Sequence, residues 1–101
     1  GANINMPDEN GTSPLQQAVI KKNLDIVKYL VENGADINAV NQSGTTALMH
    51  AAYDGGLEIV KFLLAKGANP ALVDNFDYSA ISLAEYHKHV DIADYIRSYQ
   101  D

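Results

Sequence analysis

Apolar residues recur along the chain at the spacing of short amphipathic helices. Ile26, Val27, Leu30 and Val31 stand at positions i, i+1, i+4 and i+5, which places them on one face of a helix. Gly34 follows this run, and the next residues are rich in Asn, Asp and Gly, as a reversing turn requires. The pattern therefore predicts a helix that ends before Gly34 and leads into a turn.

A second, shorter helix is predicted just upstream. Ser13 suits its N-cap and Pro14 its first position, where the missing N–H costs no hydrogen bond. Leu15 and Ala18 would form its buried face, and a connector at 22–23 leads into the next helix. Helices this short are marginal alone, so we expect the pair to bury its apolar face against neighbouring units.

This helix–connector–helix pattern returns every 33 residues, and Gly1, Gly34 and Gly67 mark the period. Equivalent positions carry the same or similar residues: Asp8, Asn41 and Asp74; Leu15, Leu48 and Ile81; Ala18, Ala51 and Ala84; Ile26, Ile59 and Ile92; Leu30, Leu63 and Ile96. A fixed period of this length indicates stacked units that share a core. The sequence therefore predicts an elongated all-α solenoid.

The period divides the chain of 101 residues, which we expect to form one domain, into four segments. Residues 1–7 correspond to the tail of a preceding repeat, 8–40 and 41–73 to full repeats, and 74–101 to a C-terminal capping repeat. The opening letters GANIN are similar to GADIN at 34–38, which follow a helix pair. We therefore expect a solenoid cut within a unit, whose melting temperature would rise if the helices upstream were restored.

The assignment of a cap depends on polar substitutions in the last unit. Glu85 stands where the earlier units carry Val and Ala, and Arg97 stands where they carry Val and Leu. Gln100 replaces the terminal glycine. Polar residues on the face that would meet another repeat are typical of the end of a repeat array.

The units resemble the ankyrin repeat. Its pattern, G-x-T-P-L-H-x-A-A followed by I-V-x-x-L-L-x-x-G-A, is similar to GTSPLQQAV…DIVKYLVENGADIN, closer to GTTALMHAAYDGGLEIVKFLLAKGAN, and more loosely similar to DYSAISLAEYHKHVDIADYI. The resemblance covers essentially the whole chain and implies an ankyrin-repeat solenoid of helix-turn-helix units joined by β-turn or hairpin fingers. The family's turn-locking histidine is replaced by Gln16, Met49 and Ser82, so we expect that side-chain-to-backbone network to be weakened or replaced.

Composition and charge narrow the classes of function. The net charge is −6 at pH 7, and no run of Lys or Arg forms a patch, so we expect neither nucleic-acid binding nor docking on an anionic membrane. No run of apolar residues comes close to the length of about 20 residues that a helix needs to span a membrane. The absence of cysteine removes disulfides and thiolate sites and fits a reducing compartment, so we expect a cytoplasmic location.

Candidate chemistry is sparse. His87-x-His89 followed by Asp91 resembles a metal cluster, but it falls in a connector that we expect to point to solvent. His50 lies in a first helix, where a packed or hydrogen-bonded role is expected rather than that of a base. Ser13 and its equivalents are explained as helix caps. We therefore predict no enzyme activity, no cofactor and no metal.

The resemblance implies that a protein partner binds a concave face made of the finger tips and the exposed side of each first helix. The tip positions are Glu9, Asn10, Thr12, Gln42, Ser43, Thr45, Asn75, Phe76 and Tyr78, and the helix positions are Ile20, Lys21, Tyr53, Asp54, Tyr86 and His87. Four of the eight aromatic residues fall in this set, which suggests an interface hot spot. The alternative is that Phe76 and Tyr78 tuck against their own turn. Asp54 and Glu9 favour a partner with a basic surface.

The remaining aromatic residues are assigned to structure. Tyr29, Phe62 and Tyr95 share one column of the second helices and are predicted to pack on the convex side, and Tyr99 is expected to cover the cap. The first hypothesis for function is a monomeric, non-catalytic protein-interaction module. A terminal regulatory or targeting segment of a larger enzyme, channel or secreted effector is an alternative, and a dedicated inhibitor or immunity protein is another. The sequence does not separate them, because a fold does not fix a function.

Overall fold

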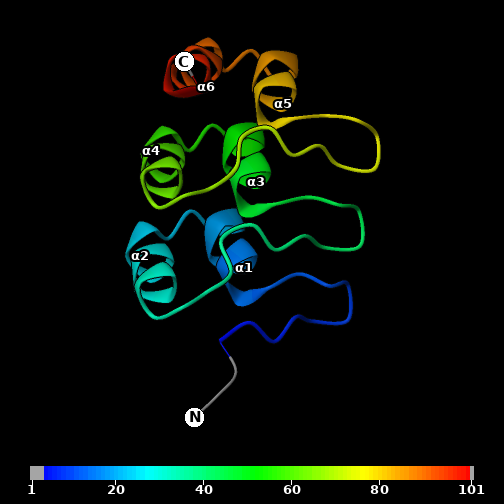
Figure 1. Ribbon diagram of the computed structural model, residues 1–101, viewed down its shortest axis with the longest axis vertical. Coiled ribbons are helices and arrows are strands. Elements are labelled where there is room, and N and C mark those ends of the chain that lie inside the picture. Colours follow the sequence, from blue (N-terminus) through cyan, green and yellow to red (C-terminus); the bar gives the residue numbers. More distant parts are fainter. Residues whose placement is uncertain (1–3, 101) are drawn as a thin grey trace.

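The structure is a computed structural model that describes residues 4–100 and stacks their helices in three layers (Figure 1). The helices are α1 (Pro14–Ile20), α2 (Leu24–Glu32), α3 (Ala47–Asp54), α4 (Leu57–Ala65), α5 (Ala80–Tyr86) and α6 (Val90–Gln100). The principal extents are 39 × 26 × 22 Å. Residues 4–100 contain no strand beyond an isolated antiparallel bridge between Val73 and Ser79. The predicted all-α solenoid is confirmed.

Each layer has the same three parts (Figure 1). The shorter helices α1, α3 and α5 form an inner column, and α2, α4 and α6 form an outer column beside it. The segments between layers project as fingers from the inner column, on the side away from the outer helices. We call the finger tips together with the exposed sides of α1, α3 and α5 the concave face.

Side-chain caps start the inner helices as predicted. Ser13, Thr46 and Ser79 each accept a hydrogen bond from the backbone N–H three residues later, at 3.2 Å in every case. This bond satisfies one of the N–H groups that a helix leaves free at its first turn. The three inner helices therefore begin at equivalent positions of the repeat.

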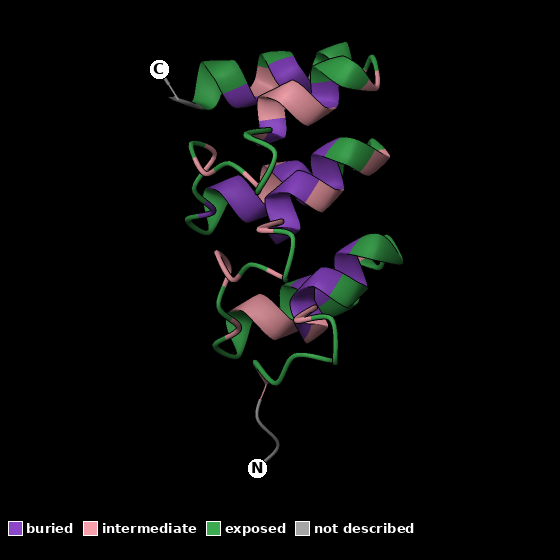
Figure 2. Cartoon of the chain, turned by 90° about the vertical axis from the view of Figure 1, so that its right-hand side faces the viewer, coloured by how far each residue is buried: buried purple, intermediate pink, exposed green. Residues whose placement is uncertain are grey.

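The apolar core lies between the layers, and the middle layer is the most completely buried (Figure 2). Ile59 and Ile92 are only 4% and 1% exposed, because a layer on one side covers each of them. Ile26, at the equivalent position of the first layer, is 48% exposed. Among the described residues no helix pair covers that side of α2, so burial here depends on the neighbouring unit.

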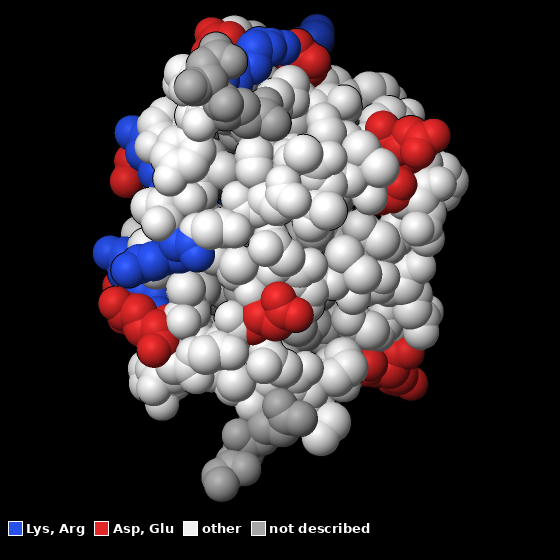
Figure 3. All heavy atoms as spheres, viewed as in Figure 1, with Lys and Arg blue, Asp and Glu red and all other residues white. Residues whose placement is uncertain are grey.

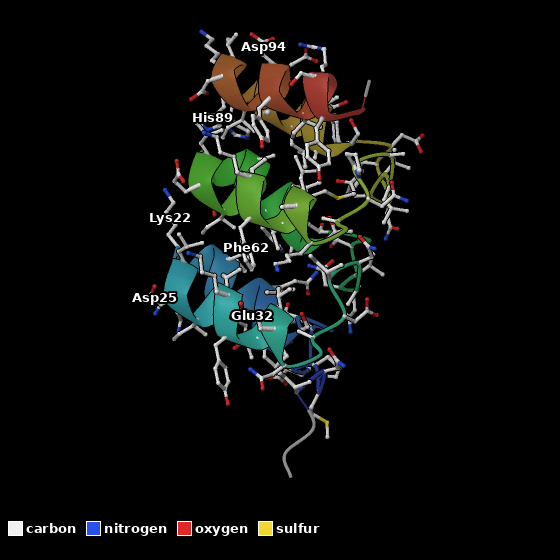
Figure 4. All side chains as sticks on the ribbon, turned by 60° about the vertical axis from the view of Figure 1, so that its left-hand side comes forward. Lys22, Asp25, Glu32, Phe62, His89 and Asp94 are labelled. Atoms are coloured by element: carbon white, nitrogen blue, oxygen red, sulfur yellow. The ribbon has the colours of Figure 1, made fainter. Side chains whose placement is uncertain are left out.

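The aromatic column of the outer helices packs as predicted at two of its three positions. Phe62 and Tyr95 are half-buried, and Phe62 reaches from α4 toward α2 (Figure 4). Lys28 Nζ lies 6.0 Å from the centroid of the Phe62 ring, and Lys61 Nζ lies 5.5 Å from that of Tyr95. The prediction is wrong for Tyr29, which is 63% exposed because no described layer lies beneath it.

Asparagine side chains tie each turn to the next repeat. Asn38 Oδ1 accepts a hydrogen bond from Asn69 N at 2.8 Å, and Asn38 Nδ2 donates to Gly67 O at 3.4 Å. Asn5 makes the same two bonds one period earlier, at 2.7 and 3.4 Å. Asn5 therefore docks on the first repeat as the tail of a preceding unit would. Gly1, the equivalent of Gly34 and Gly67 in the repeat, lies outside the described residues.

Charged side chains lie on the last layer. Arg97 forms ion pairs with Glu85 on α5 and, at 3.2 Å, with Asp94 on α6. The Tyr99 hydroxyl donates to Leu64 O at 2.9 Å, so this ring fastens α6 to the layer before it rather than covering the end of the stack. These ion pairs link the two helices of the last layer and act within α6. That this unit is a C-terminal cap stays a prediction, and the side chain of Gln100 lies outside the described part.

Gln16 takes over the turn-locking role in the first repeat. Its side chain is almost fully buried, and Oε1 accepts a hydrogen bond from Ser13 N at 2.9 Å. Its Nε2 donates to Ala39 O at 3.2 Å and to Thr45 O. One amide therefore links the cap of α1 to the next finger. The expected network is replaced here rather than lost.

Met49 and Ser82, the equivalents of Gln16 in the other repeats, form weaker or fewer side-chain hydrogen bonds. Met49 Sδ accepts a long contact of 3.5 Å from Thr46 N, and Ser82 Oγ reaches only Ser79 Oγ, at 3.1 Å. A thioether is a weak acceptor, and a serine is too short to reach the following finger. The expected weakening of the network is confirmed at these two positions.

Replacement of Gln16 should therefore destabilise the chain more than the equivalent change in the last repeat. Gln16→Ala leaves the buried Ser13 N–H and the part-buried Ala39 carbonyl without this partner, and it removes one of the two hydrogen bonds that Thr45 O accepts. We therefore expect the free energy of unfolding to fall by about 2–4 kcal/mol. Ser82→Ala, the matched control, should cost less than about 1 kcal/mol. Urea unfolding followed by circular dichroism measures both; equal losses would show that the amide does not link the repeats.

Candidate functional site

A polar side chain shapes each finger in the same way. Asp8, Asn41 and Asp74 each use Oδ1 to accept hydrogen bonds from the backbone N–H groups two and four residues later, at 2.8–3.1 Å. Asp and Asn favour this local turn because their short side chains reach back to the following backbone. The three tips therefore present equivalent positions to solvent.

The fingers are also hydrogen-bonded to one another. Gln42 N donates to Asn10 O at 3.2 Å, and Asn75 N donates to Ser43 O at 3.0 Å. The Gln42 side chain donates to Glu9 O at 3.1 Å, and that of Asn75 to Gln42 O at 3.0 Å. The side-chain amides of Gln42 and Asn75, which the sequence assigns to partner contact, thus hold the fingers together.

A Cβ atom at Gly44 would break this contact between fingers. It would lie 2.7 Å from Asn75 Oδ1, whereas a Cβ at Gly34 would meet nothing within 4 Å. Both glycines have positive φ angles, +77° and +97°, so alanine carries a backbone cost of about 1 kcal/mol at either position. We expect Gly44→Ala to lower the free energy of unfolding by about 1–2 kcal/mol more than Gly34→Ala.

Urea unfolding of the two glycine variants checks this prediction. An equal loss for both would mean that finger stacking contributes little to stability.

Three tyrosines converge on the concave face. Tyr53 at the end of α3, Tyr86 at the end of α5 and Tyr78 on the third finger line a pocket of about 250 Å³ together with Leu83 and His87. The His87 ring lies edge-on to Tyr53 and Tyr86, with centroid distances of 4.0 and 5.1 Å. The imidazole therefore contacts tyrosines from two successive layers.

A second hollow of about 270 Å³ adjoins the first. It shares Tyr53 and Leu83 with it, so the two form one continuous surface, which we call the tyrosine groove. The residues that line the groove are Thr45, Met49, His50, Tyr53, Asp74, Tyr78, Leu83, Tyr86 and His87. It runs along the exposed sides of α3 and α5 beside the third finger.

The histidines around the groove have different surroundings. His89 Nε2 lies 3.1 Å from Tyr53 O, and its ring packs so closely on Gly55 that a Cβ there would lie 3.0 Å away. The expectation that this connector points to solvent is wrong for His89, which is half-buried between the last two layers (Figure 4). Within residues 4–100, no three His, Asp or Glu side chains are placed to hold a metal ion.

His50 is packed but not hydrogen-bonded at Nε2, which is buried without a partner in the described part of the chain. Burial lowers the pKa of His50 below its usual value, and the nearby Asp54 carboxylate partly opposes this shift. The imidazole is therefore neutral at pH 7, as expected for a packed residue.

The stability of the chain should consequently fall below about pH 6.5, the pKa of an unfolded histidine. There the unfolded chain binds a proton at His50 that the folded chain does not, so stability is lost as pH decreases, by at most about 1.4 kcal/mol per pH unit. His50→Leu, which copies Leu83 of the last repeat, should lose less stability between about pH 7.5 and 5.5. Urea unfolding at both pH values measures the difference; parallel losses would contradict a depressed pKa.

Basic residues are absent from the finger side of the stack, whereas acidic residues occur on both sides. The fingers, residues 4–13, 33–46 and 67–79, contain five Asp or Glu residues and no Lys or Arg. The Lys and Arg residues lie on the outer helices, just after α4 or in the connectors within the layers, and red carboxylates edge the finger side (Figure 3). The ion pairs among the described residues all lie on α4, α5 and α6, so neither the finger carboxylates nor Asp54 has a basic partner.

The structure brings together only part of the predicted partner-binding set. The exposed members are Glu9, Asn10, Ile20, Lys21, Gln42, Ser43, Tyr53, Asn75, Phe76, Tyr78 and Tyr86, and the half-buried ones are Thr12, Thr45, Asp54 and His87. Tyr53, Tyr78, Tyr86, His87 and Thr45 line the tyrosine groove.

The other ten predicted positions line neither part of the groove, and Lys21 and Phe76 are two of them. Lys21 lines a separate hollow of about 260 Å³ on the first layer, with Ile26 and Leu30 among its neighbours. Phe76 is 75% exposed and lines neither part of the groove. The alternative in which Phe76 tucks against its own turn is therefore wrong.

Sequence reasoning missed four residues of the groove: Met49, His50, Asp74 and Leu83. Three of them lie one helical turn before Tyr53 or Tyr86, on the same side of the helix. That helical spacing could have identified them from the tyrosines. The repeat period identifies Asp74 only as the equivalent of Asp8 and Asn41.

None of the helices among residues 4–100 is long and apolar enough to cross a membrane. A family model described as ankyrin repeats (many copies) matches residues 1–47 and 31–84. No curated protein matches the chain.

Proposed function

The chain belongs to the ankyrin repeat family, whose members are generally protein–protein interaction modules, and we propose that it binds a protein partner through its concave face. The proposed module is monomeric and non-catalytic and engages neither nucleic acid nor membrane. Its partner presents a basic surface, in keeping with the charge of the fingers.

The observation that carries this proposal is the convergence of exposed tyrosines in the groove. Tyr53, Tyr78 and Tyr86 are 49%, 43% and 73% exposed, although each contributes to one continuous hollow. Tyrosine offers a large contact area at low conformational cost and is enriched at the centres of interfaces. Contact with His87 restricts two of these rings before binding, which reduces the side-chain entropy lost when a partner binds.

The polar groups of the groove support binding rather than catalysis. A covalent mechanism would require a nucleophile within hydrogen-bond reach of a base. Of the two histidines that line the groove, His50 has an unbonded Nε2, and His87 packs edge-on against tyrosine rings. The groove thus combines contact area and hydrogen-bonding groups without a paired nucleophile and base among the described residues.

Loss of the tyrosines should abolish capture of a partner. A tagged chain and its Tyr53→Ala/Tyr86→Ala variant are incubated with extract from the source cells, and retained proteins are quantified by mass spectrometry. We expect at least one protein to be retained by the unchanged chain and reduced about tenfold or more with the double variant, because hot-spot side chains contribute about 1–2 kcal/mol each.

Tyr29→Ala is the matched control, since Tyr29 is an exposed tyrosine on the other side of the stack. It should retain the same protein as the unchanged chain. Circular dichroism confirms that each variant is folded. Equal retention by the double variant, or loss with Tyr29→Ala alone, would place the interface elsewhere.

A further inference from the structure

The aromatic residues on the two sides of the stack differ in one respect. On the outer side, Lys28 and Lys66 lie over the ring of Phe62, at 6.0 and 5.8 Å from its centroid, and Lys61 lies 5.5 Å from that of Tyr95. These are cation–π distances. Within residues 4–100, no Lys or Arg lies over any ring of the tyrosine groove.

Building on the proposed function, we propose that the partner inserts an arginine or lysine side chain of an extended basic segment into the tyrosine groove. The occupied pocket is that of Tyr53, Tyr78 and Tyr86, where the aromatic walls accept the cation and its aliphatic stem. Leu83 on the same wall contacts the stem.

The charges around the groove favour this occupant. Asp54 lines neither part of the groove, but its charge acts on His50, which does, and it has no ion-pair partner in the described residues. Asp74 lines the adjoining part of the groove and uses only Oδ1 for its finger turn, so Oδ2 is available to a ligand. A guanidinium or ammonium group between the tyrosines and these carboxylates gains both cation–π and ionic contacts.

The C-terminal ends of the inner helices α3 and α5 also favour a cation in the groove. Tyr53 and Tyr86 belong to the last turns of α3 and α5, where carbonyl groups without a partner within the helix give the helix terminus a partial negative charge. No basic residue lies in the last turn of either helix. The field at this end of the groove therefore attracts a cation and repels a carboxylate or phosphate.

An uncharged apolar side chain fits the pocket less well. It would cover the tyrosine hydroxyls and the neighbouring carboxylates without supplying a hydrogen-bond donor, which carries a desolvation cost. A cationic side chain supplies donors at its tip and apolar surface along its stem. The groove therefore binds an arginine or lysine side chain more tightly than a leucine side chain, and it binds glutamate most weakly.

Small capped amino acids test the chemistry directly. The ¹⁵N-labelled chain is titrated with the N-acetyl methylamides of arginine, lysine, leucine and glutamate, and amide chemical shifts are followed by NMR. We expect the arginine and lysine probes to shift signals from the end of α3, from α5 and from the third finger, with millimolar dissociation constants. The leucine probe should bind at least threefold more weakly, and the glutamate probe should cause no saturating shift.

Variants locate the site. Tyr86→Leu and Asp54→Asn should each weaken binding of the arginine probe at least threefold, while Tyr29→Leu should leave it unchanged. A rise in salt concentration should weaken the arginine probe and not the leucine probe, because it screens the carboxylates. Stronger binding by leucine, or arginine shifts confined to the outer helices, would overturn the proposal.

Partner capture separates this inference from the proposed function. A protein retained only when Tyr53 and Tyr86 are present, combined with probes that favour leucine, would overturn the cationic occupant and leave protein binding intact. If instead no retained protein depends on these tyrosines, the proposed function fails whichever probe binds. A retained protein lost with Asp54→Asn as well as with the tyrosine variant supports both.

Discussion

Burial of one helix pair against the next is the constraint on which the rest of the structure depends. Helices of 7–11 residues gain too little from their own hydrogen bonds to persist alone in water. Ile59 and Ile92 show what stacking provides, since both are almost fully covered, whereas their equivalent Ile26 is half exposed on the open side of the first layer. Stability in such an array resides mainly in the interfaces between neighbours.

Stacking also decides which polar groups remain for a partner. Successive layers must be aligned, and Asn38 across the turns and Gln42 and Asn75 across the fingers do this with their amide groups. Side chains that hold the layers in register have fewer hydrogen bonds left for a ligand. The rings of Tyr53 and Tyr86 on the inner helices contact His87 and remain exposed, so their surface is available to a partner.

The repeat period predicted the fold, the N-caps of the inner helices and the columns that contain the tyrosines, because each depends on local pattern or on a 33-residue spacing. The contacts of individual side chains were harder to predict from the sequence. That Gln16 reaches the next finger, or that His89 contacts the carbonyl of Tyr53, depends on rotamers and distances that no spacing encodes. Tyr29 shows a further limit, since equivalence in sequence with Phe62 does not carry equivalence in burial when the neighbouring layer differs.

The position of the tyrosine groove links binding to the stability of the stack. Tyr53 belongs to the middle layer, whereas Tyr78 and Tyr86 belong to the last one, so a ligand in the groove contacts both sides of one interface between layers. A ligand that requires this interface to be closed stabilises it by mass action, and by linkage a looser interface binds the ligand more weakly. The last layer is held to the middle one by α3 against α5 and by Tyr99 on Leu64. Under the proposed function, a change at Tyr99 would therefore alter partner affinity without replacing a residue of the groove.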